Sequence, residues 1–260
     1  MFIDIHTHIL PFLDDGSKDL VMTENMLLQA KDENISEIIA TPHFLYRSNK
    51  YDKNKLLETF IKVNNLINDL GVDIKLHLGN ELFFDIDSKK VIDNNECLTL
   101  AKSKYVLIEF SHRWRKDIVQ NLIYNIELLG YKIILAHIER YENFYDEKVL
   151  ADFINKGCLA QINSDSIFTK NKAREKYLLK LIENNYIHFV ASDCHSDGRR
   201  SPKLRKSYDK IKSIIGVKAD DLFINNPKKV INNTNIDIDE PKEIKRKSVW
   251  GGIANWINKR

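Results

Sequence analysis

Residues 2–8 read Phe2-Ile3-Asp4-Ile5-His6-Thr7-His8, a short apolar run that ends in polar side chains. Side chains on a β-strand alternate between its two faces, so His6 and His8 are expected on the same side. Asp193 and His195 repeat this spacing near the other end of the chain. Both imidazoles of the first pair can then reach one cation, which makes this run a candidate metal-binding strand end.

Similar apolar runs recur along the chain and alternate with longer amphipathic stretches. Each run is apolar on both faces or nearly so, as expected for a strand covered by helices. In the helical stretch 118–129, Ile118, Leu122, Ile126 and Leu129 form the expected buried stripe. The expected strands are residues 2–5, 37–41, 74–79, 105–109, 132–136, 159–163 and 188–192. The alternation predicts an α/β fold, a single distorted TIM-like (β/α)7 barrel of mainly parallel strands.

Composition narrows the class of protein. The chain has 260 residues and a formal net charge of +3, which gives no electrostatic reason to expect nucleic acid as a partner. Its three cysteines have no metal-finger spacing and indicate a reducing compartment. No apolar run suits a signal peptide or a transmembrane segment. We therefore expect a soluble, cytoplasmic protein whose barrel domain spans residues 1–234.

Nearly every expected strand ends in a residue type that binds metals. The carboxyl ends of the strands form the active-site face of a parallel barrel, so these residues should converge there. The candidate ligands are His6, His8, His43, Glu81, Glu109, His137, Asp193 and His195. A lone histidine at a strand end is usually an ordinary polar residue, but five of the eight histidines occupy such ends. This joint placement favours a metal site at the C-terminal rim.

The ligand types also indicate which ions would bind. Imidazole mixed with carboxylate suits Mn, Fe or Zn better than Mg or Ca. A carboxylate such as Glu81 can bridge two ions, and such a pair can hold a phosphate for in-line displacement.

Two arginines are expected near the same rim. Arg140 follows His137 by three residues, and Arg200 lies in the loop after His195. The planar guanidinium group matches phosphate oxygens, which favours phosphate contact over the alternative of a surface salt bridge, more strongly for Arg140 than for Arg200. His77, inside an expected strand, is assigned a structural role.

The motifs that end the expected strands form an ordered set. They are residues 2–8, Asp14-Asp15-Gly16, Ala40-Thr41-Pro42-His43, Gly79-Asn80-Glu81, Ile108-Glu109-Phe110, Ala136-His137-Ile138-Glu139-Arg140-Tyr141 and Ala191-Ser192-Asp193-Cys194-His195. This set resembles the PHP (polymerase and histidinol phosphatase) superfamily from residue 2 to about 230. Within it, the chain is most similar to the bacterial protein-tyrosine phosphatases of capsule and exopolysaccharide operons.

The resemblance implies a site for two or three divalent transition-metal ions, with Mn favoured and Fe or Zn as alternatives. The implied ligands are His6, His8, Glu81 and Asp193 for the first ion, Glu81, Glu109 and His137 for the second, and Asp15, His43 and His195 for the third. Arg140 and Arg200 would bind the phosphate, and we assign catalytic roles to His43 and Asp193 as well. Ile138 stands where the family commonly has Pro, and Cys194 where Ala is usual; neither change removes a ligand.

The resemblance further implies a metal-dependent protein-tyrosine phosphatase. Its expected substrate is a phosphotyrosine-containing protein, the tail of a membrane-associated tyrosine autokinase that controls polysaccharide synthesis.

Three alternatives stay open. Cys194, followed after five residues by Arg200 and then by Ser201, matches the signature of cysteine-dependent tyrosine phosphatases. That alternative leaves the strand-end ligands unexplained, and Cys194 between two ligands should point away from them. A histidinol-phosphatase-like enzyme would keep the metals and change the substrate. A non-catalytic module would bind metal and a partner only.

Residues 235–260 differ from the rest of the chain because they are basic towards their end. Five apolar residues there fall on one helical face, although two glycines weaken the helix. They are Val249, Trp250, Ile253, Trp256 and Ile257, interrupted by Gly251 and Gly252. We expect a short terminal helix packed on the barrel, with contact to a kinase partner or to an anionic membrane surface as the alternative.

Overall fold

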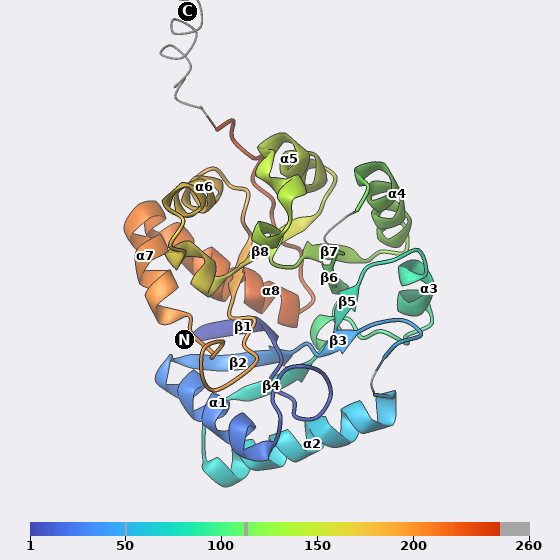
Figure 1. Ribbon diagram of the computed structural model, residues 1–260, viewed down its shortest axis with the longest axis vertical. Helices are drawn as coiled ribbons and strands as arrows, with labels where there is room; N and C mark the ends of the chain where they lie inside the picture. The colour runs from blue at the N-terminus through green and yellow to red at the C-terminus, as the bar shows by residue number, and fades with distance from the viewer. Residues whose placement is uncertain (50, 112–113, 245–260) are drawn as a thin grey trace, which may run out of the picture.

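The computed structural model describes residues 1–49, 51–111 and 114–244 (Figure 1). Its strands, all paired in parallel, form two sheets with the orders β1-β2-β4 and β3-β5-β6-β7-β8-β9. The strands are β1 (Phe2–Thr7), β2 (Ile35–Ala40), β3 (His43–Phe44), β4 (Lys75–Leu78), β5 (Glu81–Phe83), β6 (Tyr105–Glu109), β7 (Lys132–Leu135), β8 (Leu159–Asn163) and β9 (Phe189–Ala191).

The two sheets form one curved wall, because β2 leads into β3 and β4 leads into β5 after a two-residue break in each. The wall closes where Thr7 bridges Cys194, and His8 N–H donates to the Cys194 carbonyl at 2.9 Å. With each broken strand counted once, the described residues contain the seven strands that the alternation predicted. The expected distorted parallel barrel is confirmed.

The breaks were not predicted, and they have an identifiable cause. Pro42 has no N–H to give to a strand ladder. A Cβ on Gly79 would lie 2.9 Å from Leu100 Cδ2, so only glycine fits there. The Asn80 side chain adds hydrogen bonds across the break, because its Nδ2 donates to the Pro42 carbonyl at 3.0 Å and its Oδ1 accepts from Leu98 N–H at 2.9 Å. The result sets His43 opposite Glu81, each at the start of a new strand piece.

Most helices surround the strands on the outside, and the last of them lies over the centre of the barrel (Figure 1). They are α1 (Leu20–Asp32), α2 (Lys53–Leu70), α3 (Ser88–Asp93), α4 (Lys116–Glu127), α5 (Glu147–Asn155), α6 (Lys172–Glu183), α7 (Arg205–Ile215) and α8 (Asn226–Ile231). Side chains of Asp19, Asp52, Asp146 and Asn171 accept backbone N–H bonds at the first turns of α1, α2, α5 and α6. Short 3₁₀ turns cover Leu100–Lys102, Ile138–Arg140, Glu142–Tyr145, Ser164–Phe168 and Gly216–Lys218, and a π-helical turn covers Asp221–Asn225.

The predicted buried stripe of α4 is correct in part, because Ile126 is buried and Leu122 is half-buried against the main apolar cluster. Val119, Ile123 and Ile126 are its buried residues, whereas Ile118 is 47% exposed and Leu129 is 39% exposed. Two adjacent apolar stripes share this helix, and helical spacing alone does not say which of them faces the barrel.

Both faces of the wall are covered, as the apolar runs predicted. Alternate residues of one strand belong to different apolar clusters: Tyr105 and Leu107 to one, Val106 and Ile108 to the other. Helix α8 packs at the amino ends of the strands, where Asn226 Nδ2 donates to the His188 carbonyl at 3.1 Å.

Residues 235–244 lie against this same end of the barrel without forming a helix. The Lys242 N–H donates to the Asn184 carbonyl at 3.0 Å, and Lys104 Nζ donates to Asn235 Oδ1 at 2.6 Å. The expected terminal helix, with its apolar face at 249–257, lies outside the described residues, and the domain boundary at 234 stays a prediction.

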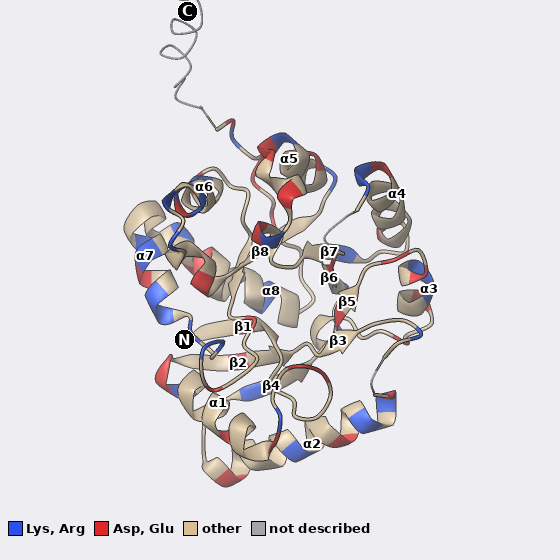
Figure 2. Ribbon diagram, in the orientation of Figure 1, with Lys and Arg blue, Asp and Glu red and all other residues tan. Residues whose placement is uncertain are grey.

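Charged residues of both signs are interspersed over the outer helices (Figure 2), in keeping with the small net charge. Among the described residues, no helix combines the length and the apolar character needed to cross a membrane.

Candidate metal centre

The structure brings all nine predicted ligand residues to the carboxyl ends of the strands. Their ligand atoms form four overlapping groups, and within each group the atoms lie within 4.8 Å of one another. The groups are His8-Asp15-His43-His195, His6-His8-Asp193, His6-Glu81-His137 and His43-Glu81-Glu109. Residues from one end of the barrel wall to the other thus meet at one point, as expected for the active-site face of a parallel barrel.

Glu81, at the start of β5, is the centre of this arrangement. Its Oε2 lies 3.1 Å from a ring nitrogen of each of His6, His8 and His43, and its Oε1 lies 2.7 Å from His137 Nε2. Burial would raise the pKa of Glu81, but the charge of His6 and the hydrogen bond with His137 hold that pKa well below its usual range. Within the described residues, the buried Oε2 atom has no hydrogen-bond partner. A buried, ionised and unsatisfied carboxylate oxygen is what a cation site requires.

The ring nitrogens of His6 and His8 point to the same conclusion. His6 Nδ1 lies 3.3 Å from Gln161 Oε1, and His8 Nδ1 lies 2.7 Å from Asp14 Oδ2, so each Nδ1 faces an acceptor and carries the proton. In the neutral form that binds a metal ion, both rings would present Nε2 as an acceptor, and these two atoms lie only 3.3 Å apart. Burial would lower the pKa of His8, but Asp14 and Glu81 raise it to about 9, so the pocket attracts positive charge. These side chains therefore fit a divalent ion.

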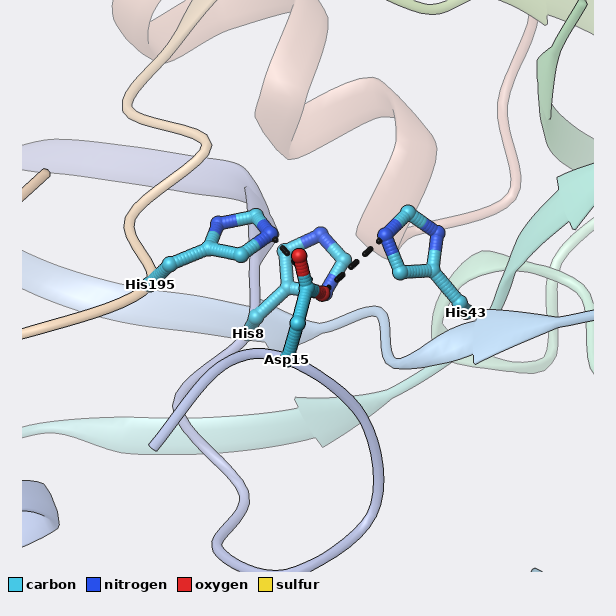
Figure 3. Close-up of side chains that lie close together, drawn as sticks. All are labelled: His8, Asp15, His43 and His195. Carbon is cyan, nitrogen blue, oxygen red and sulfur yellow. Dashed lines mark ion pairs between the residues drawn. The ribbon is translucent and has the colours of Figure 1, made fainter. Parts of the chain in front are cut away.

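Asp15 joins two more histidines at the outer edge of the centre (Figure 3). Its Oδ1 lies 3.4 Å from the Nε2 atoms of both His43 and His195. These hydrogen bonds, together with the charge on both rings, hold the pKa of Asp15 far below its usual range. His8 belongs to this group as well, whereas the family resemblance had assigned it to the first ion alone.

Asp193 connects the centre to both predicted phosphate-binding arginines. Its Oδ2 accepts hydrogen bonds from Arg140 and from Asn163 Nδ2 at 2.6 Å, and it forms an ion pair with Arg200 Nη2 at 2.9 Å. Burial would raise the pKa of Asp193, but the charges of His6 and Arg140 hold it well below its usual range. The carboxylate therefore stays ionised and suits a ligand or an anchor for the arginines better than a proton donor.

Two predicted ligands have left-handed backbone conformations. The φ angle is 32° at His137 and 51° at Asp193. Such conformations cost free energy for residues other than glycine and are often found at functional sites.

Sequence reasoning missed the groups that orient the histidines. Gln161 Oε1 accepts from the His137 N–H at 2.8 Å and also faces His6. Gln161 and Asn163 alternate along β8 with the same period of two as His6 and His8. That spacing at the end of an expected strand could have indicated that both side chains face the site. It was passed over because amide side chains are not usual metal ligands.

Asp14 is a second residue that sequence reasoning missed. Its Oδ2 faces His8 Nδ1 at 2.7 Å and accepts from the His43 N–H at 3.0 Å, so it orients two candidate ligands. We therefore expect Asp14→Asn to weaken Mn²⁺ binding about 10- to 100-fold. An amide keeps one acceptor oxygen but loses the charge. Titration of the metal-free protein with Mn²⁺ measures the effect. Asp19→Asn is the matched control, because Asp19 caps the first turn of α1 and is not a candidate ligand. Equal Mn²⁺ affinities in the wild-type protein and both variants would refute an orienting role for Asp14.

The fold and the site define a class: a parallel α/β-barrel hydrolase with a candidate metal centre of His, Asp and Glu side chains. Residues 2–232 match the family described as "Capsular polysaccharide synthesis, CpsB/CapC". The chain belongs to this family, which confirms the resemblance drawn from its motifs.

Curated relatives cover almost the whole chain. It is 32% identical over 237 residues to the tyrosine-protein phosphatase CpsB of Streptococcus pneumoniae, covering 88% of this chain and 98% of the relative. It is 30% identical over 253 residues to the tyrosine-protein phosphatase YwqE of Bacillus subtilis, covering 96% and 99%.

Solved structures agree with these matches. A structure from the work on YwqE from Bacillus subtilis and CpsB from Streptococcus pneumoniae, described as metal-dependent tyrosine phosphatases, matches with a TM-score of 0.87 and 29% identity, covering 94% of this chain and 100% of that one. A histidinol phosphate phosphatase from Lactococcus lactis matches with a TM-score of 0.55 and 18% identity, over 83% and 93% of the chains. The second likeness is one of fold alone.

Proposed function

We propose that this chain is a metal-dependent phosphomonoesterase that hydrolyses phosphotyrosine in a protein of the capsule- or exopolysaccharide-synthesis machinery, a membrane-associated tyrosine autokinase. The observation that carries the proposal is the convergence of four histidines on the ionised Glu81, with Arg140 and Arg200 bound to the adjacent Asp193. Family membership supports it, because the relatives named above are tyrosine-protein phosphatases.

The chain offers ligands for two or three divalent transition-metal ions, with Mn favoured. Glu81 would be shared between two ions. The proposed sets are His6, His8, Glu81 and Asp193; Glu81, Glu109 and His137; and Asp15, His43 and His195, with His8 beside the last set. Bound ions would supply an activated water and would withdraw charge from the phosphoryl group.

The remaining chemistry belongs to the chain's own residues. Arg140 and Arg200 are each 39% exposed, so their free N–H groups can take phosphate oxygens while Asp193 holds both guanidinium groups in place. His43, at 22% exposed, faces the opening, whereas His6 and His8 are fully buried, and it keeps its proposed catalytic role. A tyrosyl leaving group has a pKa of about 10, so it depends less on a proton donor than an alkyl alcohol does.

The structure argues against the cysteine-dependent alternative. Cys194 is fully buried, and burial raises the pKa of its thiol above the ordinary value. A nucleophilic cysteine needs the opposite, a lowered pKa and access to substrate.

Comparing substrates tests the proposed function. We expect the Mn²⁺-loaded protein to hydrolyse a phosphotyrosine peptide with a kcat/KM at least about 100-fold above that for histidinol phosphate. A higher value for histidinol phosphate would support the small-molecule alternative. Absence of turnover on both would support a non-catalytic module.

A further inference from the structure

A cavity of about 420 Å³ opens directly beside the metal centre. One side of it is formed by the candidate ligands Asp15, His43 and Glu109. The apolar part of the lining is formed by Leu13, Leu45 and Phe83, and Asp14, Ser48 and Asn49 complete it. The volume is within the range of sites that hold small ligands or single side chains.

The apolar wall is assembled from three separate parts of the chain. Leu13 lies in the loop after β1, Leu45 follows β3, and Phe83 ends β5. Leu13 is buried and belongs to the main apolar cluster, so it anchors the wall. Leu45 and Phe83 are only half-buried. Of the side chains described, neither is among those that pack against the two apolar clusters, so their free surface faces the cavity.

A charged centre beside an apolar wall is complementary to a ligand with an anionic end and a flat apolar body. We propose that the wall of Leu13, Leu45 and Phe83 binds the aromatic ring of the phosphotyrosyl side chain. The inference rests on the proposed function and names the part of the site that selects an aryl ester. A ring stacked between a leucine and a phenylalanine buries apolar surface that no aliphatic phosphoester offers.

Two other phosphomonoesters, phosphoserine and histidinol phosphate, fit this cavity less well. The phosphate of phosphoserine is separated from its backbone by a single carbon, so filling the cavity would force polar backbone groups against the apolar wall. Histidinol phosphate would place an amine and an imidazole there, at a similar desolvation cost.

A second cavity gives the peptide chain a path away from the centre. It has a volume of about 460 Å³ and shares Leu45 and Asn49 with the first. Asn49 is held in place because its Nδ2 donates to the Tyr51 carbonyl at 2.7 Å. The two cavities are therefore neighbours, an arrangement that suits a phosphotyrosine within a polypeptide.

The test uses Leu45→Ala and Phe83→Ala in the full-length, Mn²⁺-loaded protein. For each variant, kcat/KM is measured on a phosphotyrosine peptide and on a phosphoserine peptide of the same sequence, and inorganic phosphate is used as a competitive inhibitor. We expect the preference for phosphotyrosine to fall about tenfold in each variant, while the inhibition constant for phosphate changes less than about twofold. Leu13 is left intact because truncating a buried core leucine destabilises the fold.

Ile61→Ala is the matched control, since Ile61 is a 58% exposed apolar residue on α2. An unchanged preference in both cavity variants, with phosphotyrosine still hydrolysed, would overturn the aryl subsite and leave the proposed function standing. A parallel loss of phosphate inhibition would overturn it as well, because the two side chains would then be acting on the phosphate site. A wild-type protein that hydrolyses no phosphotyrosine peptide would instead overturn the proposed function itself.

Discussion

Glu81→Gln is expected to lower kcat on p-nitrophenyl phosphate by about 1,000-fold or more and to reduce the amount of bound metal. The carboxylate contacts ring nitrogens of four histidines at 3.1 Å or less. An amide removes the negative charge that two ions would share, and its NH₂ group would face those same nitrogens. Elemental analysis of the purified protein, alongside steady-state kinetics, checks both parts of the expectation.

The chain offers a close control for this substitution. Glu37 also pairs a carboxylate with an imidazole, 2.8 Å from His77 Nε2, but on β2 and β4 away from the centre. Glu37→Gln should keep kcat within about twofold of the wild-type value, because no candidate ligand contacts it. If Glu81→Gln retained both its metal and its activity, the assignment of Glu81 as the shared ligand would be refuted.

Chelation is expected to abolish phosphatase activity, and added Mn²⁺ is expected to restore it. Among the described residues, the His, Asp and Glu cluster is the arrangement that can activate a nucleophile when metal is bound. Cys194 is unsuited to that role because it is buried and the pKa of its thiol is raised. Cys194→Ser and Cys194→Ala should therefore keep kcat within about threefold of the wild-type value.

Comparing Cys194→Ser with Cys194→Ala separates an effect on catalysis from an effect on the stability of the fold. Serine places a hydroxyl in an apolar setting and should lower Tm by several degrees, whereas alanine avoids that desolvation cost. Thermal denaturation measured alongside the kinetics shows this difference. Activity that survives the chelator and disappears in both variants would establish the thiol as the nucleophile and remove the metal cluster from the chemistry.

The local pattern of the chain was sufficient to predict the barrel and the position of the candidate ligands. Alternation with period two paired His6 with His8 and Asp193 with His195, and apolar runs marked most strands. Both signals are properties of neighbouring residues, so they can be read without knowing the rest of the fold. A parallel barrel then brings the carboxyl ends of its strands together by topology.

Other features depend on segments that meet only in the folded protein. The breaks before β3 and β5 were missed because pieces of two and three residues carry no periodicity. Ile118 and Leu129 were wrongly assigned to the buried stripe of α4 because two adjacent apolar stripes were equally plausible until the barrel selected one.

Local sequence patterns were enough to predict which residues gather at the rim, whereas the group that each of their atoms faces depends on the folded barrel. Asp14 turns towards His8, and Gln161, 155 positions from His6, turns towards that ring. Asp193 holds both Arg140 and Arg200. Ligand identity follows from side-chain chemistry and strand period, which are local, whereas hydrogen-bond partners and cavity walls arise from contacts between distant segments.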